Sequence, residues 1–385
     1  MVGTTIAADQ AIMTDCRRWN LILTDQNGNR IESANGDVIS LSHTIETSSG
    51  TLTIGDIITQ NINIELRRSI DKDGTQFDYD KNASIDITYG LRNAPGLIHM
   101  GRFRVNTVSK EMDRIKVNLK DFFFVDLNER YQFNPDMLFP APVIDVIRDI
   151  LGSYMPVYLY APLKILKDNT MDEYIKSTDK AGTTLYVRDD YPHDEQGNII
   201  VIRNGETIAG KKRSEALRIC AGLLGCMLVK GRDNAAVCVR PSRVPYTVNP
   251  DRAAEPQFSG DSVTIKRIEC DIDDDTKLYS PLREPNKPYY MMTFDCPLSE
   301  DMTQSRLDEI AGEYKDLSFR PAMIDHKLGD PRLDPLDIIT YQSTYEKNNH
   351  GRLINYTMPL MYINYNFDGG LSCNLQSTAK FKEVT

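Results

Sequence analysis

The chain has few of the residue patterns on which metal and cofactor sites depend. Its five histidines are scattered, without the HExxH spacing of zinc enzymes, and its seven cysteines include no CxxC pair. An odd number of cysteines without paired spacing also argues against a disulfide framework. We therefore predict no cofactor and no metal site, and we expect the cysteines to be buried, reduced thiols.

Motifs that build active sites are absent as well. The sequence contains no GxxxxGKS or GxxxxGKT phosphate loop, no GxGxxG fingerprint and no GxSxG nucleophile elbow. The segment from Gly222 to Gly225 is too short and too apolar to cradle a phosphate, so we expect it to end a helix. Carboxylate pairs are plentiful among 55 acidic residues, so their proximity in sequence indicates no glycosidase site. We predict that the chain is not an enzyme.

Long hydrophobic runs are also missing. No apolar run approaches the roughly 18 residues that are needed to span a bilayer. The first ten residues, MVGTTIAADQ, lack the basic and apolar regions of a secretory signal. We therefore predict no membrane-spanning segment, and we expect folding in a cytosol.

Positive charge is in deficit. The 45 basic and 55 acidic residues give a formal net charge of −10. Residues 253–385 alone carry 14 Lys and Arg against 22 Asp and Glu, so most of the excess lies in the last third. Because a negative protein repels phosphate backbones, the composition disfavours specific nucleic-acid binding.

The first third of the sequence shows the two-residue alternation of β-strands. Trp19 to Thr24 leads into an Asn27-Gly28 turn, which is typical of a hairpin. Alternating polar and apolar residues then predict strands at 61–66, 84–89, 102–105 and 114–119. Several short strands joined by Gly, Asn and Asp turns predict a β-barrel or sandwich over residues 1–128.

The middle of the chain, residues 129–252, is predicted to be mixed α and β. Residues 143–151 place apolar side chains on one helical face and end at Gly152. A second helix is expected to begin at Ser214, which could cap it, and to end before Gly225. Between the helices, a turn at 194–198 leads into the apolar run 199–202.

Residues 253–385 are predicted to form a second β-rich domain with one helix. Ser299 or Thr303 could cap that helix. Its apolar stripe consists of Leu307, Ile310, Ala311 and Tyr314. The end of the chain predicts two strands around the tight turn at 368–370.

One acidic run resembles the beginning of a calcium-binding loop. Its carboxylates are Asp271, Asp273, Asp274 and Asp275. A calcium loop requires Gly at its sixth position and Glu at its twelfth, whereas this chain has Thr276 and Leu282. We therefore predict an acidic turn without a bound metal.

Stretches of the last third, taken with the order of elements before them, resemble the baseplate hub proteins of phage tails and related contractile particles, especially those of Gram-positive bacteria. The first stretch resembles the family's Gly-Asp-Pro and acidic-Pro-Gly-Asp segment, which leads into a strand. Its matching positions are Gly329, Asp330, Pro331, Asp334, Pro335 and Asp337. Leu336 departs from the pattern, because family members commonly have Gly there.

A second stretch resembles the closing hairpin of these hub proteins and contains Gly369 and Gly370. The run from Met100 to Val105 and the helices expected at 143 and 214 follow the same order as in the family. Residues 155–212 match nothing in the family and are interpreted as an insertion.

The resemblance implies a mainly β fold with an α+β insertion. Two tube-like β-barrel domains, residues 1–128 and 253–385, would flank the mixed middle domain, residues 129–252. It also implies a homotrimer, because three chains would present six barrels and join a sixfold tail tube to a threefold spike. The implied partners are the tail tube or distal tail protein ring, the central spike protein and the tape-measure protein. The implied location is the virion tail tip or baseplate, assembled in the host cytoplasm.

A hub of this kind would line a channel through which DNA passes without specific binding. Carboxylates on the channel wall would repel phosphate and keep the polymer sliding, and the Asp271 to Asp275 turn is a candidate for that wall. The alternative interpretation is a solubilising outer surface.

Two other functions remain open at this point. A receptor-binding or glycan-binding tail-tip module would expose aromatic platforms, but Trp19 lies inside an apolar strand, and only the 19 tyrosines keep that alternative open. A tail-associated cell-wall hydrolase component would need an appended catalytic domain, and the chain ends soon after the closing hairpin.

Overall fold

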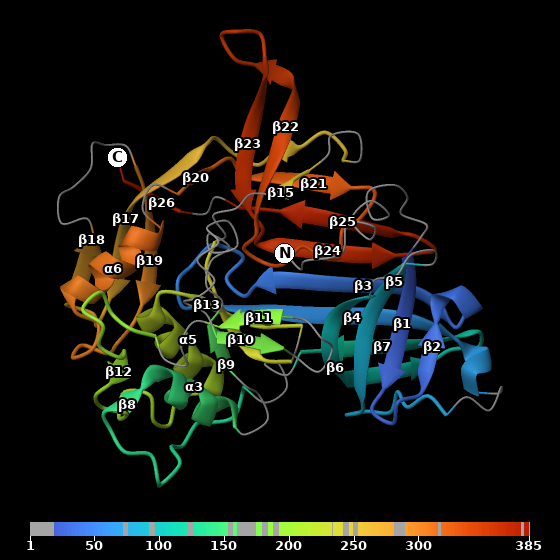
Figure 1. Cartoon of the computed structure of the whole chain (residues 1–385), viewed down its shortest axis with the longest axis horizontal. Coiled ribbons are helices and arrows are strands. Elements are labelled where there is room, and N and C mark those ends of the chain that lie inside the picture. Colours follow the sequence, from blue (N-terminus) through green and yellow to red (C-terminus); the bar gives the residue numbers. More distant parts are fainter. Residues whose placement is uncertain are drawn as a thin grey trace.

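The protein is described here by a computed structural model. It describes residues 19–71, 76–91, 97–121, 127–152, 157–159, 175–178, 184–187, 192–232, 234–241, 246–248, 253–280, 289–314, 317–378 and 381–384. Strands dominate this part of the chain, and the prediction of a mainly β fold is confirmed (Figure 1).

The largest sheet forms the centre of the molecule. In spatial order its main path consists of β16 (Gln257–Phe258), β21 (Ala322–His326), β25 (Leu371–Gln376), β24 (Tyr362–Phe367), β3 (Val38–Thr47), β4 (Ile57–Arg67), β7 (Arg114–Lys120), β6 (Leu97–Lys110), β5 (Ser84–Leu91), β1 (Trp19–Asp25) and β2 (Arg30–Glu32). Three more strands branch from β4, each paired with the one before it, in the order β13 (Met227–Lys230), β14 (Ala236–Val239) and β9 (Val157–Leu159). The sheet therefore joins strands from the beginning, the middle and the end of the sequence.

Alternation fixes which face of this sheet is buried. In β4 the isoleucines 62 and 64 are buried whereas Asn61 and Asn63 are exposed, as expected for a strand with one face in the core. The strands expected at 61–66, 84–89, 102–105 and 114–119 all lie within β4 to β7, and the first hairpin pairs Ile22 with Glu32. Within the described residues the path begins at β16 and ends at β2, so the sheet does not close on itself. The division into three domains stays a prediction.

Smaller sheets flank the central one. A five-stranded sheet consists of β18 (Lys277–Ser280), β17 (Val263–Asp271), β19 (Tyr289–Asp295), β26 (Lys382–Val384) and β20 (Ser318–Phe319). A long hairpin, β22 (Ile338–Lys347) and β23 (Leu353–Pro359), pairs at its base with β15 (Tyr246–Thr247). Minor elements are the pairs β8 (Ala141–Pro142) with β12 (Val201–Ile202) and β10 (Ile175–Thr178) with β11 (Thr184–Val187), and the 3-10 turns η2 (Ser33–Asn35) and η3 (Arg68–Asp71).

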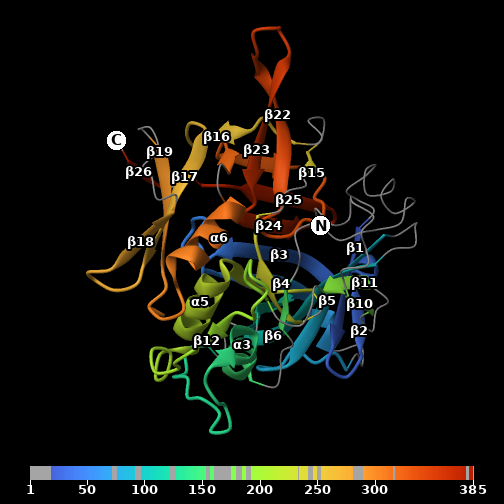
Figure 2. The same cartoon turned by 60° about the vertical axis from the view of Figure 1, so that its left-hand side comes forward.

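Three helices form where the sequence predicts them. They are α3 (Val143–Leu151), α5 (Arg213–Leu224) and α6 (Gln304–Tyr314). Figure 2 shows α5 and α6 between the five-stranded sheet and the central sheet. Thr303 caps α6, because its hydroxyl accepts the backbone N–H of Arg306 at 3.2 Å. Helices α5 and α6 therefore lie between the two sheets, and α3 packs against α5.

The predicted cap of α5 is wrong. Helix α5 begins at Arg213, so Ser214 lies inside its first turn, and no side chain caps it. Backbone carbonyls take over this role: Arg213 N–H donates to Glu129 O at 2.9 Å and Ser214 N–H to Leu127 O at 3.1 Å. A strand-like pairing between distant segments has replaced the local side-chain cap.

The other end of α5 is tied to the last third of the chain. Gly225 adopts φ +68° and closes the helix in the left-handed conformation. Arg240 donates to the Leu224 and Gly225 carbonyls at 2.6 and 3.0 Å, and Tyr314 of α6 donates to the Gly225 carbonyl at 3.0 Å. These bonds satisfy carbonyls that a helix end leaves without partners.

The described cysteines agree with the sequence analysis. Cys220, Cys226, Cys238, Cys270, Cys296 and Cys373 are free and buried, whereas Cys16 lies outside the described residues. No helix in the described ranges combines the length and the apolarity that a membrane crossing requires.

Candidate functional site

The segment from Gly329 to Asp337 lies between β21 and β22 and is largely buried. The Asp330 carboxylate accepts the Arg332 guanidinium at 2.8 and 2.5 Å and the Tyr246 hydroxyl at 3.0 Å. Burial acts to raise the pKa of Asp330, but the hydrogen bonds and the charge of Arg332 outweigh it and hold the pKa below its ordinary value. This buried, hydrogen-bonded ion pair fixes the shape of the segment.

A second ion pair joins this segment to the turn after β13. Arg232 contacts Asp334 with an Nε to Oδ1 distance of 2.8 Å, and it also donates to the Leu333 carbonyl at 3.0 Å. The Tyr365 hydroxyl of β24 donates to the same carbonyl at 2.7 Å. The Asp337 carboxylate accepts the Asp334 N–H at 2.9 Å. The middle of the chain and its end are thus locked together.

The structure brings the two stretches of the family resemblance into contact. Gly329 lies directly against β25, and a Cβ built on it would come within 2.8 Å of the Ser372 backbone. Strand β25 begins immediately after the tight turn, where Gly369 has φ +67°. Pro331 is buried and Pro335 half-buried. Gly329 therefore permits a close approach that a side chain would prevent.

Leu336 has the backbone conformation that favours glycine. Its φ is +67°, and its side chain is 1% exposed. Backbone bonds hold this geometry, since Leu336 N–H donates to Leu360 O at 2.7 Å and Leu360 N–H donates to Asp337 O at 2.9 Å. The chain keeps a left-handed turn although it has no glycine there, at a steric cost of about 1–2 kcal/mol.

The acidic run forms the exposed turn between β17 and β18. The Asp273 carboxylate accepts the backbone N–H groups of Asp275 and Thr276 at 2.9 and 2.7 Å, which lowers its pKa. Asp271 is paired with Lys277 at 2.9 Å. Asp274 and Asp275 are exposed. In the described part of the chain no group of three His, Cys, Asp or Glu side chains could hold a metal ion.

A band of small polar side chains crosses the solvent face of the central sheet, and sequence analysis missed it. We call this band the amide face. It consists of Ser42, Thr44, Asn61, Asn63, Asn106, Asn118, Asn364, Asn366, Ser372 and Asn374. Along the central row Asn364 lies opposite both Thr44 and Asn374, and charge returns only at Asp325 on one side and Lys120 on the other.

Hydrogen bonds connect members of the amide face across neighbouring strands. Asn118 donates to the Asn61 and Asn63 side chains at 2.8 and 2.9 Å, and Asn106 donates to Asn118 at 2.9 Å. On the other half, Ser42 and Thr44 donate to the Asn364 amide oxygen at 3.0 and 3.3 Å. Because these polar groups form hydrogen bonds with one another, the amide face is polar and uncharged and offers few free hydrogen-bonding groups to other molecules.

The opposite side of the same strands is buried and contains a polar cluster. His43 Nε2 lies 3.0 Å from Gln60 Oε1, and Gln60 donates to the Lys230 carbonyl at 2.7 Å. The Lys230 ammonium lies 4.1 Å from the centre of the Phe103 ring. Burial lowers the pKa of His43 to about 3, so this histidine is neutral at physiological pH.

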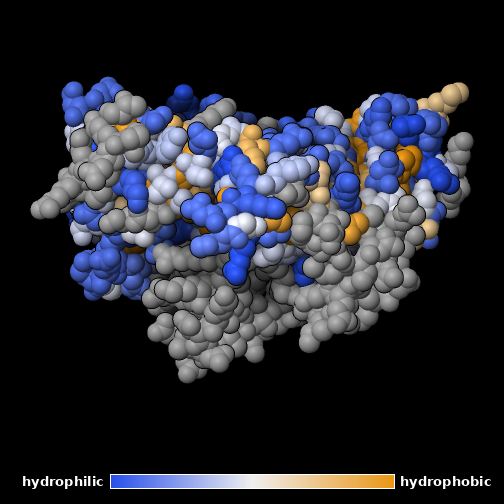
Figure 3. All heavy atoms as spheres, turned by 90° about the horizontal axis from the view of Figure 1, so that it is seen from above, coloured by the Kyte–Doolittle hydropathy of each residue, from blue (hydrophilic) through white to orange (hydrophobic). Residues whose placement is uncertain are grey.

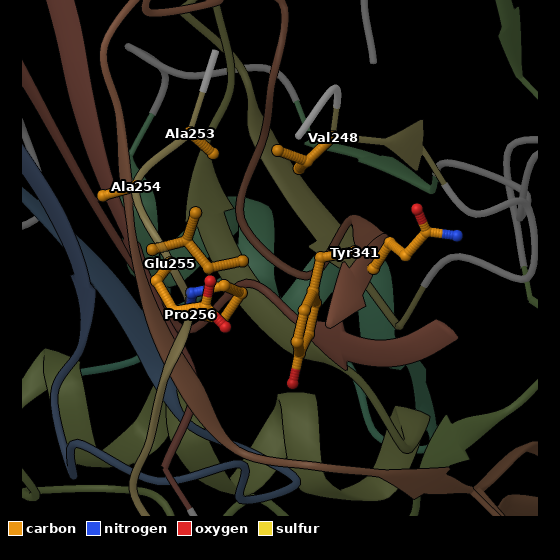
Figure 4. A pocket seen from close by; sticks show the side chains of 8 residues that line it. Val248, Ala253, Ala254, Glu255, Pro256 and Tyr341 are labelled. Atoms are coloured by element: carbon orange, nitrogen blue, oxygen red, sulfur yellow. The ribbon is translucent and has the colours of Figure 1, made fainter. Parts of the chain in front are cut away.

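A small pocket lies at the base of the β22–β23 hairpin (Figure 4). Val248, Pro256, Ile324 and Tyr341 are among its lining residues, and its volume is about 20 Å³. Ligand pockets are typically ~300–1,000 Å³, whereas this one has room for about one water molecule. It does not provide a binding site for a small organic molecule.

Comparison with known proteins gives a likeness in fold. No protein-family model matches the chain, and no curated protein matches it in sequence. Among solved structures, the tail protein from Neisseria meningitidis MC58 matches with a TM-score of 0.52 and 10% identity, covering 93% of this chain and 95% of that one. The 43 kDa tail protein of prophage MuSo2 from Shewanella oneidensis has a TM-score of 0.46 and 9% identity, covering 93% and 98%.

The lidded PdpA-VgrG complex of Francisella has a TM-score of 0.41 and 9% identity, covering 95% of this chain and 54% of that one. The Neisseria tail protein has a TM-score above 0.5 and is covered almost completely, so its fold can be compared with this chain over the whole length. At 10% identity, this match establishes that the two chains share a fold.

Proposed function

We propose that this protein is the structural hub of a phage tail or tail-like particle. In this role it would adapt a sixfold tail tube to a threefold spike and line the central channel. The observation that carries the proposal is one sheet built from both ends of the chain, in a fold shared with a tail protein.

The main path of the sheet has two parts that meet between β3 and β24, with seven strands from the first third of the chain and four from the last third. Strands β6, β7, β4 and β3 come from the first third of the chain, and β24, β25, β21 and β16 come from the last third. Antiparallel pairing of β3 with β24, from Glu46 opposite Tyr362 to Leu41 opposite Phe367, joins the two parts edge to edge. If the four strands on each side of this junction are counted and β5, β1 and β2 are set aside, three copies would present six four-stranded segments, which suits an adaptor between threefold and sixfold rings.

The amide face supports the channel role. It extends across the junction of the two parts, so a ring of three chains could present it around a common axis. A channel wall must not bind the polymer that passes along it. An uncharged surface has no cation that could replace the counterions condensed on DNA, so it gains no affinity from their release. We place the amide face on the channel wall, and the Asp271 to Asp275 turn remains a candidate for the channel rim or the outer surface.

The proposed partners follow from this position. They are two further copies of the chain, the tail tube or distal tail protein ring, the central spike protein and the tape-measure protein, with DNA passing unbound. The proposed location is the tail tip or baseplate of the particle, assembled in the host cytoplasm.

An electron-microscopy map of the assembled tail tip tests the proposal. We expect three copies of the chain in a ring, with the amide face toward the axis. Mass measurement on purified protein is the second arm. A stable monomer that never joins a ring would contradict the hub proposal. An amide face buried against another protein would contradict only the proposed channel role.

Glycan binding has less support. In the part of the chain that the structure describes, five tyrosines are fully buried, namely Tyr89, Tyr131, Tyr314, Tyr341 and Tyr365, whereas Tyr345 is 80% exposed. A glycan array with the purified chain distinguishes the two functions, because the hub proposal expects no specific signal.

A further inference from the structure

The distal part of the β22–β23 hairpin stands clear of the rest of the molecule (Figure 1, Figure 2). On one side β15 supports only its base, by pairing with Ile339 and Thr340. On the other side Arg320 N–H donates to the Thr357 carbonyl at 3.0 Å. Among the described residues no strand pairs with the hairpin beyond these points. A lone two-stranded hairpin is marginally stable in water, so we expect another surface to cover it.

The distal hairpin carries apolar side chains without a core. Tyr345 is 80% exposed, and Leu353 and Ile354 are half-buried. Seen from the side on which the hairpin projects, the described surface is mainly hydrophilic with scattered apolar spots (Figure 3). Apolar residues on a projecting element with open strand edges are typical of a docking element.

The tip of the hairpin is positively charged. Glu346 is neutralised by Arg320 at 2.7 Å, and Arg320 also lies 3.5 Å from the centre of the Phe258 ring. Lys347 and Arg352 are exposed, and neither is paired with a carboxylate of the described residues. These two charges stand on a chain whose net charge is −10.

A complementary surface exists elsewhere on the same chain. The turn between β17 and β18 exposes Asp273, Asp274 and Asp275. In both views β18 lies apart from the β22–β23 hairpin (Figure 1, Figure 2). The two charged surfaces are therefore available to two different neighbours.

We propose that the distal hairpin docks on a second copy of this chain, with Lys347 and Arg352 against the carboxylates of Asp273, Asp274 and Asp275. The inference rests on the proposed homotrimer and names the contact that holds it. Contact between two different surfaces of the same chain closes into a ring when the rotation permits. Charge would select the register, and the covered apolar residues would stabilise the contact.

Charge reversal on the full-length chain tests this contact. The variants are K347E/R352E, D273K/D274K/D275K and the combination of both. Sedimentation velocity, at about 0.05 M and about 0.5 M salt, measures the trimer dissociation constant. Each reversal alone should weaken the trimer about tenfold or more, and the combination should restore it to within about threefold of wild type.

A matched control reverses two exposed lysines elsewhere, K81E/K327E, and should leave the trimer unchanged. Circular dichroism verifies that each variant is folded. A trimer indifferent to both reversals, or one that the combination does not restore, overturns the hairpin contact and leaves the hub proposal standing. A wild-type chain that is monomeric at every concentration and never enters a ring overturns both. Loss of binding to another tail protein, with the trimer intact, also overturns the contact.

Discussion

Leu336 occupies a backbone conformation that ordinarily belongs to glycine. Glycine adopts a φ of +67° without strain, whereas Leu336 pays a steric cost for it and buries its side chain in the core in return. The sequence shows leucine where glycine is expected, but it does not show the positive φ. Two backbone hydrogen bonds hold that φ, one from Leu336 N–H to Leu360 O and one from Leu360 N–H to Asp337 O.

Substitutions at Leu336 separate two contributions to the free energy of unfolding, the strain of its left-handed backbone and the burial of its side chain. Both Leu336→Ala and Leu336→Gly should destabilise the protein by about 2–5 kcal/mol, because both lose the buried side chain. The glycine variant should be the more stable by about 1 kcal/mol, since it removes the left-handed strain. Urea denaturation measures the difference.

Leu333 provides the matched control. It is also fully buried in the same segment, but its φ is not positive. There the order should reverse, and glycine should be less stable than alanine by about 0.5–1 kcal/mol. Alanine more stable than glycine at both positions would contradict strain at Leu336.

His43 should make stability depend on pH. Its pKa is lowered to about 3 in the folded state by burial, whereas the unfolded value is about 6.5. As the pH falls below about 6.5, the unfolded chain takes up a proton that the folded chain refuses. The free energy of unfolding therefore falls by up to about 1.4 kcal/mol per pH unit and is fully restored above that range.

Denaturation of wild type and His43→Gln at several pH values measures this term. The advantage of wild type over the variant should shrink by up to about 2 kcal/mol between pH 7 and about pH 5. His350→Gln, at an exposed tip, should keep the wild-type slope. An unchanged slope in His43→Gln would refute the assignment.

At the scale of elements, local sequence patterns predicted which strands and helices form better than they predicted the residues at which these elements begin. Alternation located β4 to β7, and helical spacing located α3, α5 and α6. The start of α5 was missed because carbonyls of Leu127 and Glu129, distant in sequence, satisfy its first N–H groups. A side-chain cap can be recognised in the sequence by its residue type, whereas a cap formed by backbone carbonyls cannot, because every residue has a carbonyl.

The end of α5 gives a prediction about packing. A Cβ at Gly225 would lie 2.6 Å from Ile310 Cγ1, whereas a Cβ at Gly210 would meet nothing within 4 Å. Both glycines have positive φ, of +68° and +75°. Gly225→Ala should lose about 2–4 kcal/mol and Gly210→Ala should stay within about 1 kcal/mol of wild type. Thermal unfolding compares them, and equal losses would exclude the clash with Ile310.

At the scale of the whole molecule, the amide face could not be predicted. Alternating Asn61 and Asn63 or Asn364 and Asn366 indicates a wet strand face but does not label it. Its continuity depends on pairing β3 with β24, whose residues lie more than 300 positions apart. Periodicity identifies strands, and only the fold identifies neighbours.

Charge on this face should control passage of DNA if it lines the channel. The purified variant N61K/N63K/N364K should bind duplex DNA with an affinity that falls steeply with salt, whereas wild type should not bind. Intact particles that carry the variant should deliver DNA more slowly. The neutral variant N61Q/N63Q/N364Q controls for side-chain size. Normal delivery by lysine particles would exclude this face from the channel wall.

The pairing of β3 with β24 also imposes a delay between the synthesis of β3 and the synthesis of its partner strand. Strand β3 ends at Thr47, but its partner β24 begins only at Tyr362. At a synthesis rate of about 5–20 residues per second, roughly 15–60 seconds separate the two on the ribosome. During that time one edge of β3 has no partner, and the nascent chain is exposed to pairing with its neighbours. Yield of soluble protein should therefore depend on how quickly the last hundred residues follow the first.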